Sequence, residues 1–210
     1  MGREPLPALL FSAIPLPSCR SFWYLLAMTD RLFDPLNDRQ SRDIRNALSE
    51  AFAEALTKTC LAPVDAVAAQ YQASGLAPVY EAYIADRLMR YQEALRIIGA
   101  DTVNDVFTRA LVLWDLGLFF EVHEILEHAW LAAHGAEKEI LQAMIRAAGM
   151  YIKLAMGQPE AAHKMAAKAV KALVEHRTLV PALLPLDRLL AALKACDPQP
   201  PRLYEPQRST

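Results

Sequence analysis

The chain has 210 residues with 22 basic and 24 acidic side chains, and its formal net charge of −2 gives no reason to expect nucleic acid as a partner. Hydrophobic residues make up 54% of the sequence, which excludes a disordered chain and allows a sizeable core. The three cysteines, Cys19, Cys60 and Cys196, are far apart and odd in number, which favours free thiols in a reducing, cytoplasmic compartment and argues against a cysteine zinc site.

Four prolines interrupt the first 27 residues, so no regular helix is expected there. Met28 begins the stretch Met28-Thr29-Asp30, which resembles an ordinary cytosolic start. We therefore expect residues 1–27 to be disordered or to precede the true start of the protein. No run of about 18 uncharged apolar residues occurs anywhere, so we expect no membrane span.

Apolar residues recur at three- and four-residue spacing along most of the remaining chain, and this spacing predicts helices. The predicted helices span about residues 37–58, 64–72, 78–98, 102–114, 118–134, 137–156, 159–176 and 186–195. Gly99 is expected to end the third of them. Three arginines, Arg39, Arg42 and Arg45, form a short basic face on the first helix, which is typical of a solvated surface.

No segment alternates with the period of two that strands show, so the predicted fold is all-α. A compact helical bundle and a set of stacked helical hairpins both fit this pattern. The equal separation of Gly117 from Gly157 and of Ala129 from Ala169 favours the hairpins. We divide the chain into a helical extension at 28–100, a core domain at 101–178, a C-terminal helix at 179–196 and a flexible tail at 197–210.

The stretch DLGLFFEVHEILEHAW, residues 115–130, combines more ionisable and apolar side chains than any other part of the chain. At about 100° per residue, one face gathers the apolar side chains Phe119, Val122, Ile125, Leu126, Ala129 and Trp130. Trp130 is predicted to be buried and to anchor this helix. His123 and Glu127 lie one turn apart at the border of the face, and Glu121, Glu124 and His128 are predicted to point to solvent.

ALVLWDLGLFFEVHEILEHAW, followed by LQAMIRAAGMYIKLAMGQPEAA, resembles a bacterial and archaeal helical family known as domain of unknown function 309. The resemblance covers about residues 102–176 and rests on the pattern His-Glu-x-x-Glu-x-x-Trp with its flanking helices. It implies a compact helical domain without an established activity. The motif positions that it implies here are His123, Glu124, Glu127, Trp130, Gln142 and Gly157.

A metal site is one interpretation of the motif. His123 and Glu127, four residues apart on a helix, can reach the same divalent ion, and Glu124 would then act as the general base of a hydrolase-like enzyme. His123 is the other catalytic candidate. Two ligands do not make a coordination sphere, so a third would have to come from Asp115, His163 or His176.

The interpretation that we favour is a binding or structural module with a polar cluster at the edge of the core. His123 would then pair with Glu127, and Glu127 with Arg146, above Trp130. The predicted binding residues are His123, Glu124, Glu127, Trp130, Gln142 and Arg146. The sequence does not decide whether the protein is an enzyme. We expect no cofactor, no nucleic acid and no membrane; the partner would be a small molecule or a protein, and a homo-oligomer is compatible with the sequence.

Overall fold

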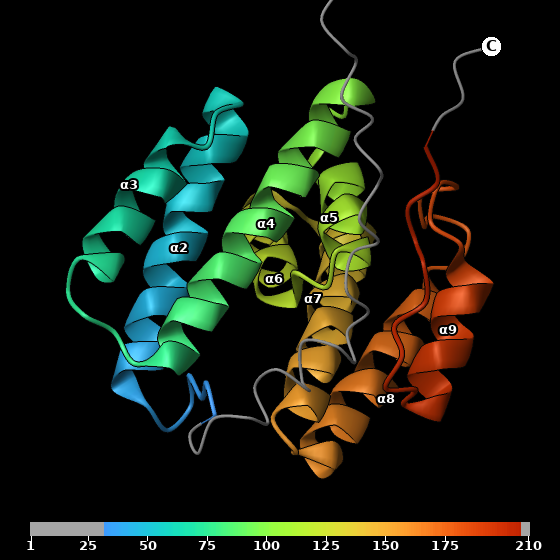
Figure 1. The fold of residues 1–210 in the computed structure, drawn as a ribbon. Helices are drawn as coiled ribbons and strands as arrows, with labels where there is room; N and C mark the ends of the chain where they lie inside the picture. The colour runs from blue at the N-terminus through green and yellow to red at the C-terminus, as the bar shows by residue number, and fades with distance from the viewer. Residues whose placement is uncertain (1–31, 207–210) are drawn as a thin grey trace, which may run out of the picture.

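The computed structural model describes residues 32–206, and this part of the chain contains eight helices and no strand, which confirms the all-α class (Figure 1). The expectations for residues 1–27 lie outside the described residues. The helices are α2 (Arg39–Lys58), α3 (Ala62–Gln72), α4 (Pro78–Ala100), α5 (Val106–Asp115), α6 (Phe119–Ala132), α7 (Gly135–Ala155), α8 (Pro159–Glu175) and α9 (Leu186–Ala195).

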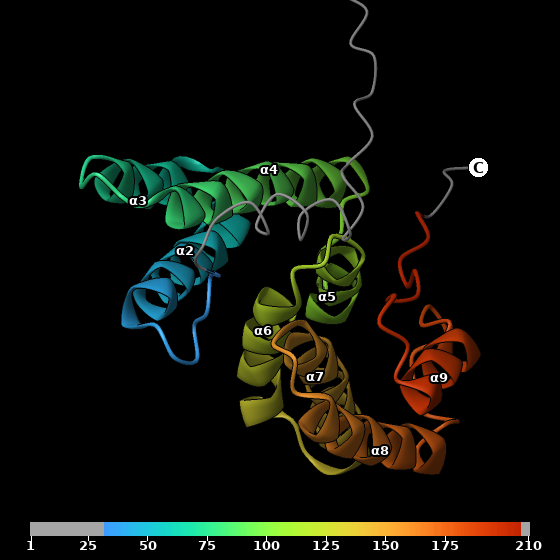
Figure 2. The same cartoon turned by 60° about the horizontal axis from the view of Figure 1, so that its bottom comes forward.

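Helices that follow one another in sequence pack in pairs, as expected for stacked helical hairpins. The most extensive contacts of this kind are between α2 and α3, α5 and α6, α6 and α7, α7 and α8, and α8 and α9. Figure 2 shows α2, α3 and α4 gathered on one side of the molecule, with α5 to α9 forming the rest. Contacts between α4 and α5 and between α2 and α6 join the two sets of helices. Within the described residues, no helix has both the length and the apolar character needed to cross a membrane.

Local side-chain chemistry sets several helix ends. Asp38 caps α2 by accepting a hydrogen bond from the backbone N–H of Ser41 at 3.0 Å, and Asp105 caps α5 by accepting one from Thr108 at 2.7 Å. The helix predicted from about residue 102 therefore begins at Val106. The prediction for Gly99 is wrong: α4 continues through it to Ala100, and the left-handed residue after this helix is Thr102, with φ of 51°.

The centre of the core between α5, α6 and α7 is aromatic. Trp114 is only 1% exposed, and its ring meets those of Phe119 and Tyr151 edge to face, each at 5.2 Å between centroids. Phe119 and Tyr151 stack on each other at 4.9 Å. The indole N–H of Trp114 donates to the backbone carbonyl of Pro201 at 3.0 Å, so the polar atom of this buried ring is satisfied.

The segment after α9 lies against α5. Both carboxylate oxygens of Asp115 accept backbone hydrogen bonds, from Leu203 at 2.7 Å and from Tyr204 at 3.1 Å. The hydroxyl of Tyr204 donates to Asp101 at 2.6 Å, and Leu203 is fully buried. Residues 201–204, which lie in the tail predicted to be flexible, therefore make defined contacts with α5 and with Asp101.

Candidate functional site

The helix that carries the motif, α6, begins after a tight turn at Gly117. This glycine has φ of +69°, a conformation that side chains other than glycine rarely adopt, and a Cβ atom there would lie 3.1 Å from Arg90 Nη1. The same nitrogen of Arg90 donates to the carbonyl of Leu116 at 2.6 Å. Val122 and Leu126 of α6 are fully buried. Their burial fixes the rotation of the helix and places His123, Glu124 and Glu127 at its outer edge.

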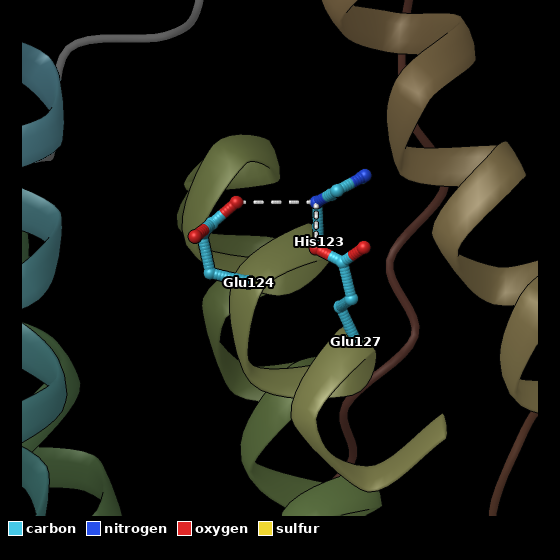
Figure 3. A group of neighbouring side chains, drawn as sticks. All are labelled: His123, Glu124 and Glu127. Carbon is cyan, nitrogen blue, oxygen red and sulfur yellow. Dashed lines mark hydrogen bonds and ion pairs between the residues drawn. The ribbon is translucent and has the colours of Figure 1, made fainter. Parts of the chain in front are cut away.

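His123, Glu124 and Glu127 converge on one another. His123 Nδ1 lies 3.2 Å from Glu124 Oε1 and 3.8 Å from Glu127 Oε2, and one ligand-type atom from each residue lies within 4.8 Å of the others (Figure 3). The three side chains are 34%, 41% and 47% exposed, respectively. The structure thus brings together three of the predicted site residues, and His123 pairs more closely with Glu124 than with the predicted partner Glu127.

The hydrogen bond to Glu124 fixes the tautomer of His123. An ionised carboxylate only accepts hydrogen bonds, so Nδ1 carries the hydrogen and the lone pair of the neutral ring lies on Nε2. Figure 3 shows Nε2 pointing away from both carboxylates. The hydrogen bond from His123 lowers the pKa of Glu124, against the opposing effect of burial and with smaller help from Arg45 and His128. Glu124 is therefore held ionised, and the outward-facing atoms of the group are acceptors.

Glu121 departs from the prediction that it faces solvent. Its side chain is 1% exposed because α4 covers it, and its Oε1 accepts a hydrogen bond from the hydroxyl of Tyr91 at 2.5 Å. Its Oε2 lies 3.8 Å from Arg87 Nη1, an ion pair that is too long for a hydrogen bond. Glu121 is thus a structural carboxylate between α4 and α6 and does not belong to the outer group.

The other predicted site residues do not join the group. Gln142 and Arg146 are half-buried on α7, and within residues 32–206 no hydrogen bond or ion pair links either of them to His123, Glu124 or Glu127. The predicted pair of Glu127 with Arg146 is therefore not formed.

The candidate third ligands also lie elsewhere. His163 is exposed on α8, His176 Nε2 pairs with Glu139 at 2.7 Å, and Asp115 holds the C-terminal segment. Within the described part of the chain, the group that could hold a metal consists of His123, Glu124 and Glu127 alone. None of the three predicted candidates for a third ligand joins His123 and Glu127.

Trp130 packs against the core but is only half-buried, and the ammonium of Lys138 lies 4.4 Å from the centre of its ring. The sequence predicted that Trp130 is buried and anchors the helix. We therefore expect Trp130→Ala to lower the free energy of unfolding by about 1–2 kcal/mol, since only part of the indole surface leaves water on folding. Urea denaturation measures this change. A loss of about 3 kcal/mol or more, as found for fully buried aromatic residues, would instead support the prediction that Trp130 anchors α6.

A charged residue that sequence reasoning assigned to a solvated face lies beside the motif. Arg45 of α2 is half-buried, and its guanidinium carbon lies 3.9 Å from the centre of the Phe120 ring of α6. Burial lowers the pKa of Arg45, and the nearby charges of Glu121 and Glu124 oppose that shift. No spacing in the sequence links α2 to α6, so only the packing of the two helices places this charge.

The comparison with protein families gives one result. Residues 107–165, which include nearly all of α5, the whole of α6 and α7, and the first turns of α8, match the family described as Domain of unknown function (DUF309). Neither a curated protein nor a protein of solved structure matches this chain. Residues 107–165, with the group of His123, Glu124 and Glu127 on their central helix, are a domain of unknown function 309.

Proposed function

We propose that this domain is a binding module whose recognition group consists of His123, Glu124 and Glu127. The observation that carries the proposal is their convergence on one point while their side chains stay a third to a half exposed. The same helix also carries Glu121, which is buried between α4 and α6 and accepts a hydrogen bond from Tyr91. The buried carboxylate thus serves the fold, whereas the outer group is left for a ligand.

The chemistry of the group selects the kind of ligand. Both carboxylates accept hydrogen bonds and carry negative charge, and Nε2 of the His123 ring faces away from them. A partner that supplies N–H donors and a positive charge satisfies all of these atoms, whereas an anion would be repelled. We therefore infer a cationic ligand, either a small molecule or a basic side chain of a protein partner.

A divalent metal is the second candidate, because three ligand-type atoms lie within 4.8 Å of one another. His123 and Glu127 would be the ligands, and Glu124 would be the base of a hydrolase-like enzyme. Two features weigh against this candidate. Zinc sites are almost always four-coordinate, with at least three protein ligands even when catalytic, and Glu124 cannot be both a ligand and a free base.

Metal analysis separates the two candidates. We expect protein purified without added metal to hold far less than one equivalent of zinc, iron or manganese, because a binding module needs no resident ion. Near-stoichiometric metal that His123→Ala removes from a folded protein would overturn this expectation and favour the hydrolase.

Titration with zinc chloride, used as a compact cation, tests the recognition group itself. We expect saturable one-to-one binding, measured by calorimetry, that is lost in His123→Ala. His128→Ala is the matched control, because His128 is an exposed histidine on the same helix outside the group. Equal zinc affinity in wild type and His123→Ala would contradict a recognition group at this position.

The stability of the same variant distinguishes binding from a purely structural role. We expect His123→Ala to change the free energy of unfolding by less than about 1 kcal/mol, because ion pairs between exposed side chains contribute little. A structural cluster with buried polar atoms would instead cost about 1–3 kcal/mol when one partner is removed. Guanidinium denaturation of the metal-free protein gives this number, with His128→Ala again as control.

A further inference from the structure

The recognition group has a positively charged neighbour that comes from outside the matched domain. Arg45 belongs to α2, and its side chain is held in place by two kinds of contact. Its Nε and Nη2 donate to Asn46 Oδ1 at 3.1 and 2.9 Å, and its guanidinium lies 3.9 Å from the centre of the Phe120 ring. These contacts fix the position of the charge relative to α6.

The charge lies on the side of the helix that carries Glu124. Phe120 and Glu124 are four residues apart on α6 and therefore share a face, so a guanidinium over Phe120 is about one turn from the Glu124 carboxylate. Figure 3 shows Glu124 on the side of α6 that faces α2, with His123 and Glu127 further round. Contacts between α2 and α6 agree with this view.

We propose that Arg45 is a specificity-determining residue of the recognition group and selects against divalent cations. This inference rests on the proposed function and names the ligand class more closely. The two carboxylates of Glu124 and Glu127 and the guanidinium of Arg45 together carry one net negative charge. A singly charged ammonium or guanidinium group neutralises that charge, whereas a divalent ion leaves an excess positive charge beside a fixed guanidinium.

Coulomb repulsion explains the preference. The repulsion between a fixed positive charge and an ion grows in proportion to the charge of the ion, so Arg45 penalises a divalent ion twice as strongly as a monovalent one. The penalty is largest at low ionic strength, where the Debye length is about 30 Å, and it is screened at high salt. The positive charge of Arg45 thus gives a physical reason to expect that the purified protein holds no metal at this group.

The test is zinc titration of the full chain by calorimetry at low ionic strength. Arg45→Gln removes the charge, and we expect it to tighten zinc binding roughly three- to tenfold. Arg45→Met, which also removes the charge and leaves an unbranched apolar side chain at this position, should shift the affinity for zinc in the same direction. Arg45→Lys keeps the charge and should bind zinc like the wild type. Arg39→Gln removes the same charge from an 89% exposed site on the same helix and should change nothing.

Salt dependence gives a readout that a purely structural role of Arg45 would not move. The difference between Arg45→Gln and wild type should shrink in 0.5 M sodium chloride, since at about 0.5 M the Debye length falls well below 8 Å. Wild-type or weaker zinc affinity in both neutral variants would overturn the inference about Arg45. An equal increase of zinc affinity in Arg45→Lys and Arg45→Gln would also overturn the inference. The increase would then come from altered packing and not from the loss of charge.

The failure of this inference can be told apart from the failure of the proposed function. If His123→Ala weakens zinc binding while Arg45→Gln has no effect, the recognition group stands and the role of Arg45 falls. If His123→Ala has no effect in either the wild-type or the Arg45→Gln background, the zinc is bound elsewhere and both proposals fall.

Discussion

Trp114→Ala is expected to lower the free energy of unfolding by about 3–5 kcal/mol, the range for truncation of a fully buried aromatic side chain. Trp114 is 1% exposed and touches Phe119 and Tyr151 with its ring, so its removal leaves a cavity lined by two other aromatic rings. It also leaves the carbonyl of Pro201 without its donor. Because a single domain is typically stable by only about 5–15 kcal/mol, this change is a large fraction of the total.

Two comparisons make the test specific. Trp114→Phe keeps most of the ring volume and loses the hydrogen bond to Pro201, so we expect a smaller loss of about 1–3 kcal/mol. Trp130→Ala removes the same side chain from the half-buried position on α6. Urea denaturation of the three variants ranks them directly. If Trp130→Ala proves more destabilising than Trp114→Ala, the central packing of Trp114 is refuted.

The contrast between these two tryptophans shows what a helical wheel predicts. Both lie on apolar faces of their own helices, and the periodicity places both helices within a few residues of their observed positions. A tryptophan side chain is fully buried only if another segment of the chain also covers it from the side that would otherwise face solvent. For Trp114 that segment includes Pro201, 87 residues later in the sequence. No local pattern contains this contact, and the prolines near it indicate a loop.

The same reasoning explains which parts of the candidate site were predicted. His123 and Glu127 lie four residues apart, so sequence spacing places them side by side on one helix. The closer contact of His123 with Glu124 was not predicted, because adjacent residues of a helix point in different directions. Arg45 joins them only through the packing of α2 on α6. Glu121 was assigned to solvent because a helical wheel of α6 describes that helix alone. It does not show that α4 packs over the side chain of Glu121. Neighbours four residues apart on one helix are therefore predictable here, whereas charges that meet across helices are not.

Glu121→Ala is the second substitution with a large expected effect, about 3–5 kcal/mol of the free energy of unfolding, because it leaves the buried charge of Arg87 without its counter-ion. The Arg87 side chain is only 14% exposed, and its Nε and Nη1 have no hydrogen-bond partner within residues 32–206. The guanidinium packs over the ring of Tyr83 at 4.8 Å, and burial raises the pKa of this tyrosine to about 12. Tyr83 is therefore neutral near pH 7, and Glu121 is the anion that offsets Arg87.

Exposed carboxylates on the same helix provide the control. Glu124→Ala removes an equal charge from a side chain that is 41% exposed, and we expect it to cost less than about 1 kcal/mol. Glu121→Gln keeps an acceptor for the Tyr91 hydroxyl but replaces the charged oxygen that faces Arg87 with an uncharged NH2 group, so its cost measures mainly the electrostatic part of the effect. A loss for Glu121→Ala no larger than that for Glu124→Ala would show that Glu121 is not buried by α4.

A double-mutant cycle separates the loss of attraction from the exposure of an unpaired charge. Arg87→Met removes the buried cation, and Glu121→Leu removes the buried anion while filling a similar volume. Each single change leaves one buried charge without its partner, so both should be strongly destabilising.

The double variant should recover most of the loss, since replacing a buried ion pair with apolar groups of similar volume is often neutral or stabilising. We expect the coupling energy between the two sites, measured by denaturation of the four proteins, to be at least as large as the loss in one single variant, about 3–5 kcal/mol. Additive losses would mean that Arg87 and Glu121 do not interact across the 3.8 Å that separates them.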